Sequence, residues 1–323
     1  MIPRPAPAGA SPAVFPLLAD GRLRIECDPA LVPLLERWLP LLPYDPTDRP
    51  VGGAVIRVAA GELSRVEMAT GAAALRLGTA EARVDAAGAR ATLHAPLCAA
   101  AADLETHAAD LFVQPDADAE AASWDLYGLC TLLGAMLLGR LGRALVHAAA
   151  IVAPDGRAWL LTGDTHAGKS TTSINLITAG WRFVSDDNVV LFRDGEGELM
   201  VEGWPRRFHL DAGWEDGRPG QARGEIHPHE RWPGRWLRTA PLGGLLFPRV
   251  EADRPTELLP LAAAHALTAL MRQSPWLTGD RAKAPDLLSL LSAACQRPAY
   301  ELRLGLDTYR DTDRLLRVLA PLG

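Results

Sequence analysis

One segment, residues 157–192, constrains the chain more than any other, because it reads as strand, glycine loop, helix and strand. Residues 159–161 form a short apolar run that predicts a buried strand before the loop. Apolar positions between residues 174 and 177 predict a helix after it. The loop matches the P-loop pattern G-x-x-x-x-G-K-[ST] with Gly163, Asp164, Thr165, His166, Ala167, Gly168, Lys169 and Ser170.

The residue types of this loop suit the binding of phosphate. Glycines let the backbone curl, so that successive N–H groups point at phosphate oxygens, and the helix that follows adds the positive end of its dipole. Lys169 supplies a mobile positive charge, and the hydroxyl of Ser170 is an oxygen ligand for Mg²⁺. The chain has only two lysines, Lys169 and Lys283, which makes a chance match improbable. We therefore expect a nucleotide site.

Composition narrows the setting of this site. The 323-residue chain carries a net charge of −6, which argues against nucleic acid as a partner. Its four cysteines are far apart and show no C-x-x-C spacing, which predicts free thiols in a reducing cytoplasm. The most apolar segment, residues 126–138, is too short to span a bilayer, so we expect a buried helix and no membrane partner. The first 16 residues lack the apolar stretch of a signal peptide.

Changes of pattern divide the chain. Residues 1–16 are rich in proline and alanine and are expected to be a flexible tail. Residues 17–119 predict a small α+β domain, since short segments separated by glycine follow each other in the manner of an antiparallel meander. Residues 120–323 are expected to form the catalytic domain, where strands alternate with helices and predict an α/β core with a mixed sheet.

Two further features bring polar side chains to the loop. Residues 182–185 predict a second strand that ends at Asp186 and Asp187. Residues 145–152 predict a strand before the loop strand, and the tight turn at Pro154 makes the two strands a hairpin or close neighbours, which places His147 near the nucleotide. Two alternatives stay open here. The Asp pair could bind a metal without acting as a base, and His147 could be an ordinary core histidine.

Together these residues resemble the catalytic core of HPr kinase/phosphorylase. That family has a His in the strand before the P-loop and an Asp-Asp strand that follows the loop at an unusually short distance; here Asp186 comes about 16 residues after Ser170. The resemblance covers residues 145–192. From residue 241 onward the chain is similar to stand-alone relatives of this kinase found beside peptide and natural-product genes. The resemblance implies a P-loop kinase core of the HPr kinase/PEP carboxykinase type that uses ATP and Mg²⁺.

The resemblance also implies roles for single residues. Lys169 would hold the phosphates, while Ser170 and Asp186 would hold Mg²⁺. Asp187 would be the general base toward the acceptor hydroxyl, with His147 beside it. The chemistry agrees, because phosphoryl transfer consists mostly of positioning and charge neutralisation, with one carboxylate accepting the hydroxyl proton. Which of the two Asp residues is base and which is metal ligand stays open.

The chain also departs from the family pattern. Thr171 stands where the family has an acidic residue after the loop serine, and His166 takes a position that is usually small or apolar. The phosphorylase signature is absent after residue 200, so phosphorylase activity and HPr as substrate both stay open. Arg206 and Arg207 are candidates for neutralising the γ-phosphate.

The sequence thus predicts an ATP-dependent kinase that transfers the γ-phosphate to a hydroxyl, in the first place a serine, of a peptide or protein such as a precursor peptide. Two alternatives stay open: a kinase for a small-molecule natural product, and a nucleotide-binding regulator without efficient transfer. The sequence leaves the oligomeric state open, a homo-oligomer included.

Overall fold

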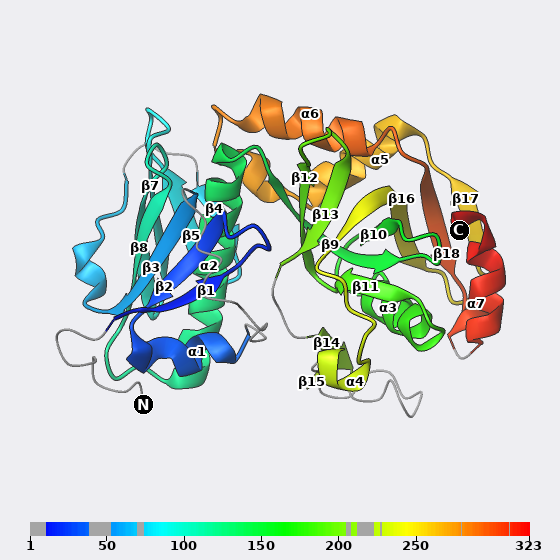
Figure 1. Ribbon diagram of the computed structural model, residues 1–323, viewed down its shortest axis with the longest axis horizontal. Helices are drawn as coiled ribbons and strands as arrows, with labels where there is room; N and C mark the ends of the chain where they lie inside the picture. Colours follow the sequence, from blue (N-terminus) through cyan, green and yellow to red (C-terminus); the bar gives the residue numbers. More distant parts are fainter. Residues whose placement is uncertain are drawn as a thin grey trace. The chain divides into compact units, whose positions relative to one another are not determined.

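The computed structural model describes residues 11–38, 53–69, 74–204, 208–211, 223–226, 228–278, 280–309 and 311–323. The chain divides into two compact units, and each is built on a large mixed sheet (Figure 1). Unit 1 comprises Met1–Arg143 and Pro275–Leu287, and unit 2 comprises Ala144–Ser274 and Leu288–Gly323. The predicted α/β class with a mixed sheet is confirmed.

Unit 1 holds an eight-stranded sheet in the order β1-β2-β3-β8-β7-β6-β5-β4. Strand β3 runs parallel to both of its neighbours, and the other pairs are antiparallel. The strands are β1 (Ala13–Pro16), β2 (Leu23–Cys27), β3 (Ala54–Ala60), β4 (Ala74–Leu77), β5 (Ala80–Val84), β6 (Arg90–Ala95), β7 (Cys98–Asp103) and β8 (Ala108–Val113). The helical segments are η1 (Pro29–Leu31), α1 (Val32–Glu36), η2 (Leu63–Arg65), α2 (Ala119–Arg140) and η3 (Pro275–Thr278).

Helix α2 is the core helix of unit 1. It begins after Asp118, whose carboxylate accepts hydrogen bonds from the N–H groups of Glu120 and Ala121 at 3.1 and 2.9 Å. Among the described helices, α2 alone is long and apolar enough to cross a membrane, but 83% of its most apolar window is buried inside the structure. The expected burial over residues 126–138 is therefore confirmed, but the helix has 22 residues and is longer than the segment judged too short to span a bilayer.

The structure differs from two expectations about the N-terminal half. The tail expected over residues 1–16 is ordered from Ala13, because β1 gains backbone hydrogen bonds by pairing with β2; residues 1–10 lie outside the described residues. The boundary expected between residues 119 and 120 differs from the observed division after Arg143, because α2 packs on the sheet of unit 1. Ser123 lies inside α2, where its hydroxyl donates to the carbonyl of Leu34.

Unit 2 contains a second sheet with the path β10-β9-β12-β13-β16-β18-β17, in which β11 also pairs with β9 and β10 also pairs with β16. Its strands are β9 (Ala144–Val152), β10 (Ala158–Thr162), β11 (Arg182–Ser185), β12 (Asn188–Arg193), β13 (Leu199–Gly203), β16 (Thr239–Val250), β17 (Glu257–Pro260) and β18 (Ala299–Leu304), with β14 (Phe208–Asp211) and β15 (Arg223–Ile226) as a separate pair. Its helical segments are α3 (Lys169–Thr178), α4 (Pro228–Arg231), α5 (Ala263–Arg272), η4 (Leu306–Thr308), α7 (Thr312–Leu319) and η5 (Ala320–Leu322); α6 (Ala284–Ala294) runs from unit 1 into unit 2.

Strand β9 organises unit 2. Its second half lies between β10 and β11 and is antiparallel to both, so β10 and β11 run parallel to each other. Its first half pairs with β12. The hairpin of β9 and β10, closed by a hydrogen bond from the N–H of Ala153 to the carbonyl of Arg157, confirms the neighbour relation predicted from the tight turn.

Apolar side chains on one face of this sheet form the main core of unit 2. Trp159, Leu161 and Leu246 come from the sheet, Leu176 comes from α3, and Leu315 comes from α7. All five are at most 5% exposed. Burial of this kind contributes about 25 cal/mol for each Å² of apolar surface removed from water. The core therefore fixes α3, and with it the loop before α3, against the sheet.

A second fixed point lies where β18 ends. The hydroxyl of Thr256 donates to a carboxylate oxygen of Asp307 at 2.6 Å and accepts from the N–H of Gly305 at 2.9 Å. Arg314 Nε lies 2.7 Å from the other carboxylate oxygen. Burial alone would raise the pKa of Asp307, but the hydrogen bonds from Thr256 and the charge of Arg314 outweigh it and hold the pKa below its usual range.

Replacing Thr256 by valine removes this hydroxyl and nearly keeps the side-chain shape. We expect Thr256→Val to lower the free energy of unfolding at pH 7 by about 1–3 kcal/mol, because buried groups lose a hydrogen-bonding partner. The contribution of Asp307 is present above about pH 4, the pKa of an unfolded Asp, and is lost as the pH falls through its lower folded pKa. The difference in the free energy of unfolding between wild type and Thr256→Val should therefore become smaller in acid.

Urea denaturation followed by tryptophan fluorescence at pH 7 and pH 3 measures both effects. Thr268→Val is the matched control. Thr268 is exposed on α5, and its hydroxyl donates to the carbonyl of Ala264 within the same helix. A loss at position 256 no greater than that at position 268 would contradict the assigned role.

Candidate functional site

The loop of residues 163–170 and the Asp pair lie at the same edge of the unit 2 sheet. Strands β10 and β11 are parallel, and β16 and β18 continue the parallel set beyond β10. Ligands of α/β sheets bind at the carboxyl ends of parallel strands. Here those ends lead into loop 163–170 after β10 and into Asp186 and Asp187 after β11. We call this the loop edge.

Loop 163–170 depends on two unusual backbone conformations. His166 has a φ of 66° and Gly168 has a φ of 98°. A side chain at Gly168 would meet Leu304, because a Cβ there would lie 2.6 Å from Leu304 Cδ1. The end of β18 thus packs directly against the loop. Glycine is required at position 168 both for its φ and for this close approach.

Lys169 and the start of α3 give the loop its electrostatic character. The Lys169 ammonium group donates to the carbonyls of Gly163 and Asp164 at 2.7 and 3.2 Å. Helix α3 begins after Gly168 with no side-chain hydrogen bond capping its first turn, which contains Ser170 and Thr171. The first N–H groups of a helix have no partner inside the helix, so this turn offers donors and a partial positive charge at the loop edge.

Strand β11 is held on both of its edges, which fixes the Asp pair. One edge pairs with β9, and on the other the main chain of Phe183 exchanges hydrogen bonds with Arg235 and Leu237 at 3.0 and 2.8 Å. The two carboxylates then differ in environment. Asp186 is only 4% exposed, whereas the Asp187 side chain is 24% exposed. One carboxylate is thus enclosed and its neighbour is open to an incoming group.

His147 contacts Asp187 directly. Its Nε2 lies 3.4 Å from Asp187 Oδ1, within ion-pair distance. The other carboxylate oxygen of Asp187 accepts from the side-chain amide of Asn188 at 2.7 Å. The contact between His147 and Asp187 follows from the sheet. Asn188, the residue after Asp187, is the register partner of His147 in the pairing of β12 with β9. The structure therefore brings His147 and Asp187 together.

Gln273 is a site residue that the sequence did not reveal. It follows the last residue of α5, and its side-chain carbonyl Oε1 lies 2.9 Å from His147 Nδ1. Its side-chain amide Nε2 donates to Asp164 Oδ1 at 2.9 Å. No motif or spacing links position 273 to a loop more than a hundred residues earlier. Only the fold places the end of α5 beside β9.

The contacts described above do not involve every predicted site residue. Thr165 and His166 are exposed on the loop, and Ala167 is partly buried. Arg206 and Arg207 lie outside the described residues. Within the described part of the chain, no group of three or more His, Cys, Asp and Glu side chains forms a ready metal site. Mg²⁺ is commonly held by one or two protein ligands together with substrate phosphates, so this finding does not decide the question.

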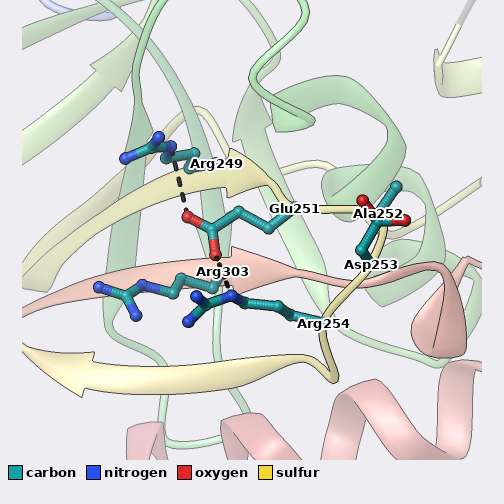
Figure 2. Close-up of a pocket in the computed structure, with 6 residues that line it drawn as sticks. All are labelled: Arg249, Glu251, Ala252, Asp253, Arg254 and Arg303. Atoms are coloured by element: carbon teal, nitrogen blue, oxygen red, sulfur yellow. Dashed lines mark ion pairs between the residues drawn. The ribbon is translucent and has the colours of Figure 1, made fainter.

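A pocket of about 540 Å³ opens at the ends of β16 and β18 (Figure 2). Glu251 lies between two arginines in this pocket, 3.5 Å from Arg249 and 3.8 Å from Arg254. Arg303 has its own partner, Glu301, at 3.1 Å. Each guanidinium group therefore has a carboxylate partner, and the Arg249 and Arg254 side chains are 70% and 67% exposed. Such a balanced surface cluster does not by itself indicate an anion site.

Comparison with known proteins shows distant similarity to solved structures. No protein-family model matches the sequence, and no curated protein matches it. Among solved structures, the chain is similar to that of the Hpr(Ser) kinase/phosphatase from Coxiella burnetii, with 14% sequence identity and a TM-score of 0.32. The match covers 55% of this chain and 96% of that chain. Because both similarity values are low, the function proposed for this chain rests on its own residues and geometry.

The loop geometry predicts a strong effect of adding one methyl group. We expect Gly168→Ala to lower the free energy of unfolding by about 1–3 kcal/mol, because alanine at this φ is strained. Leu304 must also move to admit the Cβ. Chemical denaturation measures the loss. In the matched control, Gly195→Ala, a Cβ would meet no atom within 4 Å. Equal stability of the two variants would refute the packing described for loop 163–170.

Proposed function

We propose that this protein is an ATP-dependent phosphotransferase that transfers the γ-phosphate to a hydroxyl group, serine in the first place, of a peptide or protein. One observation carries the proposal. A loop with the P-loop sequence and an open carboxylate, Asp187, lie at the same sheet edge, and a histidine contacts that carboxylate at 3.4 Å. Nucleotide binding and base catalysis both need groups of this kind in one place.

Several contacts support a phosphate site at loop 163–170. The uncapped first turn of α3 offers N–H donors, and Lys169 is buried beside them with 8% exposure. Ser170 and Asp186 would hold Mg²⁺, since hydroxyl and carboxylate oxygens are its preferred ligands and a cation would offset the cost of burying Asp186. Bound there, Mg²⁺ would neutralise charge on the phosphate oxygens.

The proposed transfer uses the Asp pair asymmetrically. The acceptor oxygen attacks the γ-phosphorus, the bond from phosphorus to the bridging oxygen breaks, and ADP leaves with that electron pair. The hydroxyl proton passes to Asp187, the more exposed of the two carboxylates. Asn188 and His147, which contact its two oxygens, orient the base. Asp186, enclosed next to it, is the better metal ligand of the pair.

The setting of the reaction is also proposed. All four cysteines are free and buried, and burial raises the pKa of Cys27 to about 12 and that of Cys295 to about 11. Unreactive free thiols agree with a cytoplasmic protein. A precursor peptide encoded beside the kinase gene is the acceptor to test first. Mass spectrometry after co-expression would detect added phosphate, and a sugar or antibiotic that gains it instead would point to a small-molecule kinase.

Two pairs of variants test the assigned chemistry. We expect Lys169→Met to abolish ATP binding in titration calorimetry, whereas Lys283→Met, at the only other lysine of the chain, should leave binding unchanged. We expect Asp187→Asn to lower phosphate transfer by about 10²- to 10⁴-fold, the usual contribution of a general base, with ATP binding retained. Asp110→Asn, at an Asp side chain that is 58% exposed in unit 1, is the matched control.

Transfer of label from γ-labelled ATP to the acceptor provides the readout. If Asp187→Asn transfers as fast as wild type, Asp187 is not the base. If wild type binds ATP but neither hydrolyses it nor transfers phosphate to any acceptor, the protein is a nucleotide-binding regulator rather than a kinase.

A further inference from the structure

We propose that Gln273 is a positioning residue that holds a hydrogen on Nδ1 of His147 and so fixes the direction in which the ring presents Nε2 to Asp187. Through Asp164, the same side chain ties this pair to loop 163–170. Its catalytic meaning rests on the phosphotransfer proposed above, but the hydrogen-bond order itself does not.

The order begins at Asp164. An ionised carboxylate can only accept hydrogen bonds. Because Asp164 Oδ1 lies 2.9 Å from one end of the Gln273 amide, that end must be the NH₂ group. The amide oxygen therefore faces the other way, toward His147. The direction of the amide is thus set by a charged partner and is not a free choice between two equivalent flips.

The same reasoning then fixes the imidazole. An amide oxygen accepts hydrogen bonds and cannot donate, so His147 Nδ1, 2.9 Å away, must carry the hydrogen. The other ring nitrogen, Nε2, lies 3.4 Å from Asp187 Oδ1.

The main chain makes this arrangement rigid. The N–H of His147 donates to the carbonyl of Gln273 at 2.9 Å, and the N–H of Gln273 donates to the carbonyl of Leu270 at the end of α5. Gln273 is also largely buried, at 8% exposure. The backbone and the side chain of Gln273 therefore each make a hydrogen bond with His147. These two hydrogen bonds restrict rotation of the His147 ring.

A fixed ring suits the proposed transfer, because His147 contacts the carboxylate assigned as the base. A histidine free to turn would lose this contact and with it a support for the position of Asp187 relative to the acceptor.

Asp164 extends the chain of contacts to the phosphate cradle. Its side chain accepts from Gln273, and its main-chain carbonyl accepts from Lys169 Nζ at 3.2 Å. One loop residue therefore contacts both the lysine assigned to the phosphates and the side chain that orients the histidine. The position of the loop and the proton on His147 are thereby linked through Asp164 and Gln273.

Nitrogen NMR of the protein labelled with ¹⁵N-histidine tests the proposal directly. Long-range ¹H–¹⁵N correlations distinguish the two neutral tautomers, and the His147 signal is identified by its loss in His147→Gln. We expect wild type to show hydrogen on Nδ1. In Gln273→Met, which nearly keeps the side-chain length but removes both hydrogen bonds, the hydrogen should move to Nε2. Gln296→Met, at an exposed glutamine, is the matched control and should show the wild-type pattern.

A second variant serves if Gln273→Met does not fold. Asp164→Ala, on the exposed loop, removes only the group that sets the amide direction, so the share of the Nδ1–H tautomer should fall. Wild type with hydrogen on Nε2 and none on Nδ1 would overturn the proposal, and so would an unchanged tautomer in the folded variants. These outcomes do not depend on phosphate transfer, so they are distinguishable from failure of the proposed function.

Kinetics then test the catalytic meaning. With an acceptor in hand, Gln273→Met should lower kcat by about tenfold or more, a modest part of the usual general-base contribution, and leave the KM for ATP unchanged within about twofold. A purely structural role would instead reduce the fraction of active protein, which titration of ATP-binding sites measures. An unchanged kcat would show that the tautomer does not matter for transfer.

Discussion

Strand β9 is the constraint on which the geometry of unit 2 depends. One half of it separates β10 from β11, and the other half pairs with β12. Because antiparallel pairing fixes the register residue by residue, Ala148 is set opposite Thr162 and His147 opposite Asn188. His147 therefore lies where the end of β10 and the start of β12, just after Asp187, come together. A change of register by one residue would turn His147 to the other face of the sheet.

The sequence revealed the local parts of this arrangement for a physical reason. Loop 163–170, α3 and the Asp pair follow one another within a single strand–helix–strand unit, where propensity and spacing carry the information. The hairpin of β9 and β10 has the same local character. Gln273 could not be found in this way, because its contact with Asp164 depends on where α5 ends in space. Local pattern does not determine such long-range contacts.

The errors in the N-terminal half have a related cause. Strand β7 consists mainly of alanine, which has low strand propensity, so its sequence carries no strand signal. Pairing with neighbours overrides that preference. The short helical turn η2 also interrupts the meander predicted for this part of the chain. Strand β2 is the opposite case, because its buried and partly exposed residues alternate strictly, as strand periodicity requires.

The loop edge contains strained backbone and buried charged side chains, which the apolar core does not. His166 and Gly168 adopt left-handed conformations, and Lys169 and Asp186 are charged side chains with less than a tenth of their surface exposed. Each feature costs free energy, because strain and buried charge both oppose folding. The apolar core between the sheet, α3 and α7 offsets that cost. A chain selected for stability alone would keep the core and lose these residues, so their concentration at one sheet edge is itself evidence that the edge serves a function.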